Sequence, residues 1–429
     1  MTTNDNNINT FKNWLKKNGA KFPHLYIENY NKGERGVKTR KNLNSNKNII
    51  YIPKKLIIYV DMGKKTDWGV QLQKYHESVS SPDITYILLF MIKNIDNKED
   101  FFYPYYQTLP KNLNHLPIFW REKDLQFLES SYIRKEVEKR KQSFINDYGI
   151  LCRACNNFAD VCSEDKFMYV RSIIGSRNFG LFIDGTKQSA MVPFADMLNH
   201  SENTNTKWYY NSKKHRFVLD SVNKIKSGSE IVDTYGTKCN SKYLLYYGFT
   251  LSDDFENRNY IEIRVSQQVK TGSLFLEKNK LISNAYKCYI NADFGSNEFS
   301  SLLRFLRIAN ASKEEFESIS NHLNNGLTPI SKRNEIATLS HLAFYVKKTL
   351  ESYTKTIEEN KKELKKLISY SNATFAVKLV IGEKKILKAI SDFCKLSLEI
   401  LLFNRRISKR KLKNNMNGYI ILIKQLNST

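Results

Sequence analysis

The feature that most constrains this 429-residue chain is a hydrophobic periodicity that changes three times along its length. After a short N-terminal helix, residues 1–66 hold short segments rich in β-branched and aromatic side chains, whereas long stretches over 67–168 have helical spacing. Short β-type segments return over 169–266, and helical spacing dominates 267–429. The sequence therefore predicts an α+β fold, with a β-rich core interrupted by a helical insertion and followed by an all-α C-terminal domain.

Individual segments support this division. Ile49–Val60 is typical of a strand, a turn around Pro53 and a second short strand, while Thr85–Lys93 has the spacing of an amphipathic helix. Tyr260–Val265 is the last expected strand. Beyond it, Ser340–Ile368 and Phe375–Phe403 have apolar residues at helical spacing with charged residues between them.

The chain is strongly basic, with 68 Lys and Arg residues against 43 Asp and Glu residues and a formal net charge of +25. Such an excess attracts acidic protein surfaces and polyanions. A proteome rich in Lys and Asn is the favoured explanation of the count, and a solvated helix face is the favoured interpretation of the basic stretch Arg405–Lys413. Nucleic acid therefore remains a partner only through a non-specific basic surface.

The cysteines and the apolar segments indicate in which cellular compartment the protein is expected. Six cysteines are too few and too scattered for a secreted disulfide framework, and the pair Cys152 and Cys155, with Cys162 nearby, lacks a second pair at zinc spacing. Met1–Thr10 lacks the regions of a signal peptide, and the apolar run Ile84–Ile92 is too short to span a bilayer. We expect a soluble monomer in the cytoplasm or nucleus, without a metal site or a membrane segment.

Two later segments carry groups suited to chemistry. Met191–His200 is an apolar run that ends in Asp, Asn and His, and Glu230–Gly236 contains the first of two Tyr-Gly pairs. The second pair is Tyr247-Gly248, twelve residues further on. Taken alone, each segment has an ordinary explanation, because Asn-His pairs occur at helix ends and buried tyrosines often bond to backbone. Their order along the chain is the stronger signal.

In this order the segments resemble the SET-domain protein methyltransferases, and specifically the subgroup of the Rubisco large-subunit lysine methyltransferase. Thr349–Glu359 and Ile381–Leu387 are similar to the helical signatures of that subgroup's C-terminal substrate-binding domain. Each motif is weak alone, but the ordered set covers nearly the whole chain. The resemblance implies S-adenosylmethionine as methyl donor, S-adenosylhomocysteine as product, no metal, and a protein substrate.

The same resemblance assigns a cofactor loop near the N-terminus. Glu34, Arg35 and Gly36 match the family's glycine turn, where the lack of a side chain lets the backbone approach the ligand closely. The turn begins at Gly33 and is one residue longer than the usual Gly-x-Gly. These three residues are the first predicted cofactor-binding group.

Further cofactor contacts are implied by the two later segments. Ser176 and Arg177 match a Ser-Arg pair at the junction of cofactor and substrate, where a guanidinium can grip a carboxylate through two hydrogen bonds. Asn199 and His200 match the segment that holds the adenosine end of the cofactor, so His200 is not expected to act as a general base.

The resemblance also implies the residues around the transferred methyl group. Tyr235 matches the tyrosine closest to methyl transfer and also touches the cofactor, while Tyr247 matches an aromatic wall beside the acceptor. Asp196 is a third catalytic candidate that could hold the incoming amine, and Ser176 and Phe179 complete the substrate-binding set. Methyl transfer is an in-line displacement, which needs alignment and a dry channel rather than a covalent intermediate.

Two positions bear on the acceptor. One branch of the family methylates histidine and has Asn two residues after the active-site Arg and Trp directly before the Asp. This chain has Phe179 and Ala195 there, as the lysine-type members do, which favours lysine. A third alternative is an inactive SET fold that binds acidic partners or nucleic acid, but Arg177, Asn199 and Tyr235 are all present.

Overall fold

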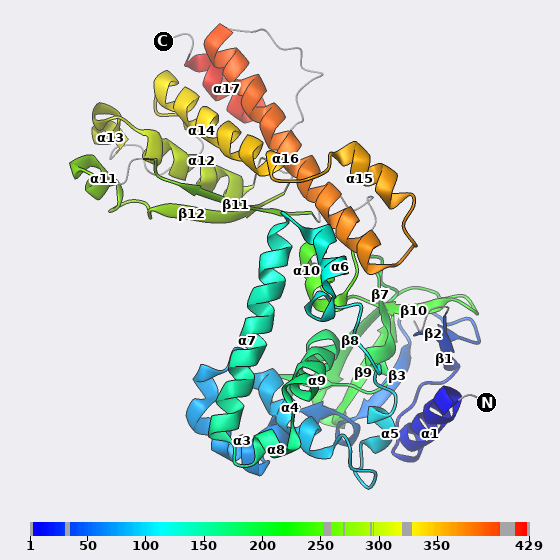
Figure 1. Cartoon of the computed structure of the whole chain (residues 1–429). Helices are drawn as coiled ribbons and strands as arrows, with labels where there is room; N and C mark the ends of the chain where they lie inside the picture. Colours follow the sequence, from blue (N-terminus) through cyan, green and yellow to red (C-terminus); the bar gives the residue numbers. More distant parts are fainter. Residues whose placement is uncertain are drawn as a thin grey trace. The chain divides into compact units, whose positions relative to one another are not determined.

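The computed structural model describes residues 3–30, 35–251, 259–268, 271–291, 294, 296–319, 328–403 and 417–426. The chain divides into two compact units (Figure 1). The first comprises Met1–Asn114 and Glu138–Lys238, and the second comprises His115–Val137 and Cys239–Thr429. The predicted cut after residue 266 therefore falls inside the second unit, and the chain enters that unit twice.

A four-stranded sheet in the first unit joins segments that are far apart in sequence. Its order is β1 (Leu25–Asn29), β2 (Arg35–Thr39), β10 (Glu230–Asp233) and β7 (Asn199–His200). β10 is antiparallel to β2 and parallel to β7. Because β10 lies between them, the glycine-containing strand and the Asn-His segment lie on either side of the same short strand.

Two three-stranded sheets complete the β structure of the first unit, in the orders β3-β9-β8 and β4-β6-β5. In β5, Leu181 and Ile183 are buried whereas Phe182 between them is 60% exposed, which is the alternation of a strand with one face on the core. The bounds of the six strands are β3 Asn48–Pro53, β4 Ile58–Tyr59, β5 Asn178–Ile183, β6 Thr186–Met191, β8 Thr206–Asn211 and β9 Arg216–Ser221.

The helical insertion predicted from the sequence is present. Its most buried helix is α4 (Pro82–Asn94), which begins with proline in its first turn and packs its apolar residues inward. α9 (Glu164–Arg177) begins at Ser163, whose side chain accepts the backbone N–H of Lys166 as an N-cap, and it delivers Arg177 directly to the start of β5. The other helices here are α1 Thr3–Lys17, α2 Val60–Lys64, α3 Asp67–Leu72, η3 Gln73–Ser78, α5 Tyr103–Tyr106, α7 Tyr132–Ala154, which crosses into this unit, and α8 Phe158–Val161.

The second unit is largely helical, as predicted, but it also contains a two-stranded sheet. β12 (Ala285–Ile290) pairs antiparallel with β11 (Ile261–Ser266), so the expectation of helices alone beyond residue 267 was wrong for these six residues. Its described helices are α6 Glu122–Leu125, α10 Asn240–Tyr247, α11 Ser273–Lys278, α12 Asn297–Asn310, α13 Lys313–Ile319, α14 Lys332–Glu351, α15 Ile357–Leu364, α16 Asn372–Phe403 and α17 Asn417–Gln425.

The stretch Ser340–Ile368, predicted to be helical, is divided between two helices. α14 ends at Glu351, and α15 starts after Thr356, whose hydroxyl accepts the backbone N–H of Glu359 while the Glu359 carboxylate accepts the backbone N–H of Thr356. This reciprocal capping box satisfies two backbone donors that a new helix would otherwise leave unpaired. The chain can therefore break its helix here at low cost.

A buried ion pair holds the core of the second unit. Arg307 of α12 donates two hydrogen bonds, of 2.7 and 2.8 Å, to the Glu335 carboxylate of α14, and Tyr419 of α17 donates a third. The exposed fractions of the Arg307 and Glu335 side chains are 3% and 0%. A bidentate pair of this kind offsets the cost of burying two charges because every oxygen of the carboxylate is used.

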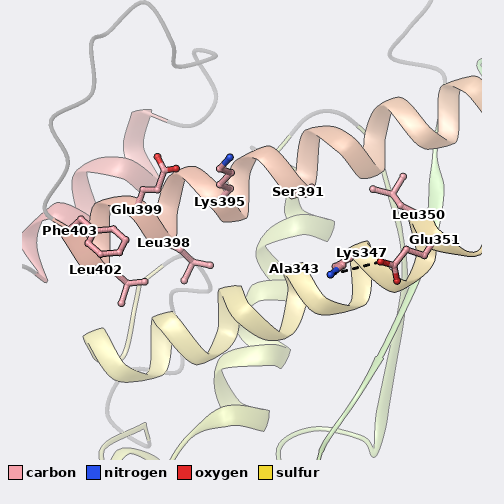
Figure 2. Close-up of a pocket in the computed structure, with 10 residues that line it drawn as sticks. All are labelled: Ala343, Lys347, Leu350, Glu351, Ser391, Lys395, Leu398, Glu399, Leu402 and Phe403. Carbon is pink, nitrogen blue, oxygen red and sulfur yellow. Dashed lines mark ion pairs between the residues drawn. The ribbon is translucent and has the colours of Figure 1, made fainter. Parts of the chain in front are cut away.

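An apolar groove of about 550 Å³ runs between α14 and α16 in the second unit (Figure 2). Leu350 and Leu398 line it, and Leu402 and Phe403 at one end are 53% and 76% exposed. A weak ion pair of 3.9 Å between Lys347 and Glu351 lies on its α14 side.

In the described part of the chain no helix is long and apolar enough to cross a membrane. No group of three or more His, Cys, Asp or Glu side chains placed to hold a metal ion occurs among the same residues. Burial raises the pKa of Cys155 to about 11 and that of Cys162 to about 12, so both are neutral thiols at physiological pH.

Candidate functional site

Gly36 lies where no side chain would fit. A Cβ at this position would lie 2.6 Å from the Tyr30 hydroxyl and 3.0 Å from Nδ2 of Asn199, and closer still to the Glu230 carboxylate. The sequence predicted glycine here for close approach to a ligand, and the structure shows that the neighbouring polar side chains impose the same requirement. The predicted cofactor residue Glu34, with Gly33, lies outside the described residues.

The amide of Asn199 is fixed by two acceptors. Its Nδ2 donates to the backbone oxygen of Arg35 at 3.0 Å and to Oε1 of Glu230 at 2.7 Å. Burial and the nearby Glu230 carboxylate raise the pKa of Tyr30 to about 12, so this phenol is neutral. The sequence marked Glu230 only as the start of a segment, yet it sets the orientation of the predicted adenosine-binding amide.

His200 and Tyr235 are joined by backbone and ring contacts. Nδ1 of His200 accepts the backbone N–H of Tyr235 at 3.1 Å, and the two ring centroids lie 5.2 Å apart. Burial lowers the pKa of His200, and therefore the neutral imidazole that this acceptor role needs is the favoured form. The Tyr235 hydroxyl donates to the backbone oxygen of Leu198 at 2.9 Å. His200 is thus a positioning group for the segment that carries Tyr235.

Arg177 and Asp196 meet in a buried cluster. Nη1 of Arg177 donates to the Asp196 backbone oxygen at 2.7 Å and lies 3.5 Å from its Oδ2. Tyr105, which the sequence did not single out, donates its hydroxyl to the same Oδ2 at 2.8 Å. The Asp196 side chain is 0% exposed. One of its oxygens is therefore shared by a phenol and a guanidinium, while Oδ1 has no partner among the described residues.

Arg35 adds a second guanidinium to this cluster. Burial, and then the positive charge of Arg177, lower its pKa to about 10, against the favourable effects of Asp196 and Tyr105. The group remains charged at neutral pH. Its Nη2 is buried without a hydrogen-bond partner in the part of the chain that the structure describes. Two cations facing one carboxylate leave a surplus positive charge, which suits an anionic ligand.

The predicted substrate residues Ser176 and Phe179 flank Arg177. The Ser176 hydroxyl bonds back to the carbonyl oxygens of Ser172 and Ile173 at 3.0 and 3.2 Å, so its proton is used within α9. Phe179 is half-buried and lies edge-on to Trp208, with ring centroids 5.4 Å apart.

Trp208 links this aromatic group to a buried acid. Burial raises the pKa of Asp233 to about 6, while hydrogen bonds from the Thr234 backbone and the Trp208 side chain oppose that rise. Asp233 is 3% exposed and pairs with His200 across β10 and β7. Neither Trp208 nor Asp233 had a role predicted from the sequence.

Tyr247 belongs to the second unit, so the structure describes it apart from the other predicted residues. It ends α10, its ring lies 6.4 Å from that of Tyr243 and 6.3 Å from that of Phe249, and burial raises its pKa. Gly248 caps this helix with φ +79°, and a Cβ there would lie 2.5 Å from the carbonyl oxygen of His115. These contacts fix the end of α10.

The fold and the cluster of Gly36, Arg177, Asn199, His200 and Tyr235 correspond to two domain families. The SET domain profile matches residues 34–236, and the Rubisco LSMT substrate-binding profile matches residues 270–387. The chain therefore carries a SET domain followed by a Rubisco LSMT substrate-binding domain.

Similar characterised proteins include two actin-histidine N-methyltransferases. The protein from Gallus gallus is 26% identical over 399 residues, and that from Homo sapiens is 24% identical over 401 residues. Each alignment covers 87% of this chain and 66% of the relative. The chain thus spans slightly less than two thirds of the length of both proteins.

Solved structures share the fold. A structure of Rubisco LSMT bound to AdoMet is 23% identical, with a TM-score of 0.78, and the match covers 97% of this chain and 98% of that one. The SET domain of LSMT bound to lysine and AdoHcy is 24% identical, also with a TM-score of 0.78, over 98% of this chain and 99% of the other.

Proposed function

We propose that the protein transfers a methyl group from S-adenosylmethionine to a nitrogen atom of a histidine or lysine side chain in a protein substrate. The observation that carries the proposal is the buried cluster in the first unit, where Arg35, Arg177 and Asp196 lie beside the predicted adenosine segment. The two family profiles, which together cover most of the chain, support the same reaction class.

The residues present fit this donor. The α-carboxylate of S-adenosylmethionine suits Arg177 and the unpartnered Nη2 of Arg35, because a buried guanidinium with an unused N–H group favours an anion. Its adenosine end suits the Asn199 amide, whose plane is already set by Glu230 and the Arg35 backbone. When bound, S-adenosylmethionine supplies an electrophilic methyl group on a sulfonium. The nitrogen of the substrate attacks this methyl group directly, so no side chain of the enzyme has to act as a nucleophile.

The work left to the protein is alignment, exclusion of water and control of the acceptor proton. Tyr235 is held by its backbone on His200 and by its hydroxyl on Leu198, so its ring and oxygen are fixed before any substrate arrives. The phenol oxygen of Tyr235 still has lone pairs, and these can accept a hydrogen bond from an N–H of the residue that is methylated. Tyr235 is therefore our candidate for orienting the acceptor nitrogen.

Histidine is the acceptor that the comparisons favour. The characterised relatives that match over 87% of the chain are named actin-histidine N-methyltransferases. An imidazole with a reference pKa of about 6.5 is mostly neutral at pH 7, and one ring nitrogen then has a free lone pair. Such an acceptor needs no deprotonation before attack.

Lysine is the second candidate, because a specific observation favours it. Phe179 and Ala195 occupy the two positions where the histidine-methylating branch has Asn and Trp. Ala195 is 1% exposed and leaves no indole beside Asp196, and Phe179 presents an aromatic edge shared with Trp208. An ammonium acceptor must lose its proton, which burial of the amine beside a sulfonium would favour.

The test uses the full chain, radiolabelled S-adenosylmethionine and two peptides that differ only in His or Lys at one position. Actin is the protein substrate for the histidine arm, and an acidic cell extract fraction serves for the lysine arm. Mass spectrometry then locates the methyl group. Exclusive transfer to histidine would remove the lysine candidate, and exclusive transfer to lysine would remove the histidine one. No binding of the donor in calorimetry would contradict the proposed function itself.

A matched pair of variants sharpens the acceptor test. Phe179→Asn places a hydrogen-bonding amide beside Arg177, whereas Phe179→Leu removes the aromatic edge without adding a polar group. If Phe179 selects lysine, the Asn variant gains activity on the histidine peptide and the Leu variant does not. Equal behaviour of the two variants would show that this position does not choose the acceptor.

A further inference from the structure

The strongest unassigned feature of the first unit is a tyrosine of the helical insertion that reaches the donor site. Tyr105 belongs to the four-residue helix α5 and is 0% exposed. Its hydroxyl donates to Oδ2 of Asp196, a residue 91 positions away in the sequence, at 2.8 Å. Its ring stacks at 6.1 Å on Phe11 of α1. The phenol is therefore fixed by packing on one side and by a charged acceptor on the other.

We propose that Tyr105 is a positioning residue of the methyl-donor site, acting through Asp196 on Arg177 and Arg35. The inference rests on the proposed function, since the ligand in question is the α-carboxylate of S-adenosylmethionine. Tyr105 itself makes no hydrogen bond to either guanidinium among the residues that the structure describes. It acts by holding the carboxylate that both arginines face.

The chemistry of the phenol suits this role. Burial and the negative charge of Asp196 keep the pKa of Tyr105 well above its ordinary value, so the hydroxyl is a permanent donor. A donor on Oδ2 fixes the rotation of the Asp196 carboxylate. Because Oδ2 of Asp196 already accepts the Tyr105 hydroxyl, only Oδ1 of Asp196 remains to attract Arg35. Nη2 of Arg35 has no hydrogen-bond partner among the described residues. That nitrogen is the one available to an anion.

The backbone of Asp196 is restrained independently. Phe194, two residues earlier, has φ +76°, a conformation that non-glycine residues rarely adopt, and its ring stacks on Phe22 with centroids 4.2 Å apart. The Asp196 N–H donates to the Val192 oxygen at 3.0 Å. Because the backbone is held, loss of the Tyr105 hydrogen bond frees only the carboxylate. That carboxylate can then turn and pair with Arg35.

Pairing with Asp196 would occupy the Arg35 guanidinium, which S-adenosylmethionine needs for its α-carboxylate. The loss of affinity should therefore concern the amino-acid end of the ligand and not its nucleoside end. We expect Tyr105→Phe to raise the Kd for S-adenosylmethionine about tenfold, which is about 1.4 kcal/mol. The Kd for 5′-methylthioadenosine, which has the nucleoside and sulfur but no amino-acid tail, should change less than twofold. We expect kcat at saturating donor to stay within about threefold.

Tyr106 provides a matched control from the same helix. Its hydroxyl is also buried, but it has no hydrogen-bond partner within the described residues. Tyr106→Phe therefore removes the same atom from the same helix without touching Asp196. The experiment is isothermal titration calorimetry of both variants and the wild type with the two ligands, with thermal unfolding measured on each protein to establish folding.

Three outcomes separate the explanations. A loss confined to Tyr105→Phe and to the ligand with the amino-acid tail supports the proposal. Equal losses for both ligands, or for both tyrosine variants, would mean a merely structural role and would overturn it. A wild type that binds neither ligand would instead defeat the proposed function. Should Tyr105→Phe not fold, Arg35→Met tests the same cluster, and unchanged S-adenosylmethionine binding there would refute the proposal.

Discussion

Removal of the Tyr235 hydroxyl gives the most direct test of how the site works. In Tyr235→Phe the ring keeps its position against His200, 5.2 Å away, and the backbone N–H still donates to that imidazole. The 2.9 Å hydrogen bond from the hydroxyl to the Leu198 oxygen is lost. A neutral hydrogen bond of this kind contributes about 1 kcal/mol to the free energy of unfolding, so the variant folds.

The kinetic cost is larger than the structural one. A polar group fixed beside the reacting nitrogen in a water-excluded site is worth about 3 to 4 kcal/mol of the barrier, which corresponds to a roughly 10²- to 10³-fold fall in kcat. Donor binding is expected to change by less than about twofold, because the Asn199 and Arg177 contacts are untouched. Single-turnover methylation and calorimetry measure the two quantities separately.

Tyr210 supplies the control for this experiment. It lies in β8 of the same unit, and its buried hydroxyl has no partner among the described residues, so Tyr210→Phe removes an equivalent atom away from His200. Turnover by Tyr235→Phe within about tenfold of wild type, or an equal loss in Tyr210→Phe, would refute the assignment of Tyr235 to the reacting centre.

Three further predictions concern proton binding and stability. Between pH 7 and 9, kcat/KM on a lysine acceptor rises up to about a hundredfold because the reference pKa is about 10.4, whereas on a histidine acceptor it rises less than about twofold. Since burial raises the pKa of Asp233 to about 6, the folded state binds its proton more tightly than the unfolded chain does, and stability falls as pH rises from about 4 to 6. Asp233→Asn removes this pH-dependent loss of stability, so the variant should be about 2 to 3 kcal/mol more stable than the wild type in urea unfolding at pH 7. Equal stability of the two proteins at pH 7 would contradict the conclusion that burial raises the pKa of Asp233. Arg307→Met leaves the buried Glu335 carboxylate without its cation, so the unfolding free energy drops by about 3 to 5 kcal/mol, and a drop below 1 kcal/mol would show that the pair is dispensable.

Periodicity predicted the fold well, because it records which faces of an element are buried. The strand–turn–strand segment, the helical insertion and the long C-terminal helices all follow from local spacing. β12 was missed, since only Cys288 and Ile290 among its six residues are buried and the alternation is short. The break in the predicted helix Ser340–Ile368 had a readable signal, because Thr356 and Glu359 have the spacing of a capping box.

The site was harder to predict than the fold, because its contacts are long-range. Tyr105 lies within an aromatic stretch that reads as ordinary core, and nothing local to it points to a carboxylate 91 residues away. The orientation of Asn199 depends on Glu230, 31 residues further on and on another strand. A sequence motif can indicate which side chains belong to a site. Only the paired strands of the folded structure show which atoms of those side chains already make hydrogen bonds.

The way the second unit closes its core bears on where the chain can be cut. The substrate-binding profile ends at residue 387, yet Ile400 and Leu401 of α16 and Ile420 and Ile423 of α17 belong to the same buried cluster as α12 and α14. Tyr419 also completes the hydrogen bonding of Glu335. A fragment designed on the profile alone would expose this apolar surface and would aggregate, whereas one that extends through residue 426 keeps it covered.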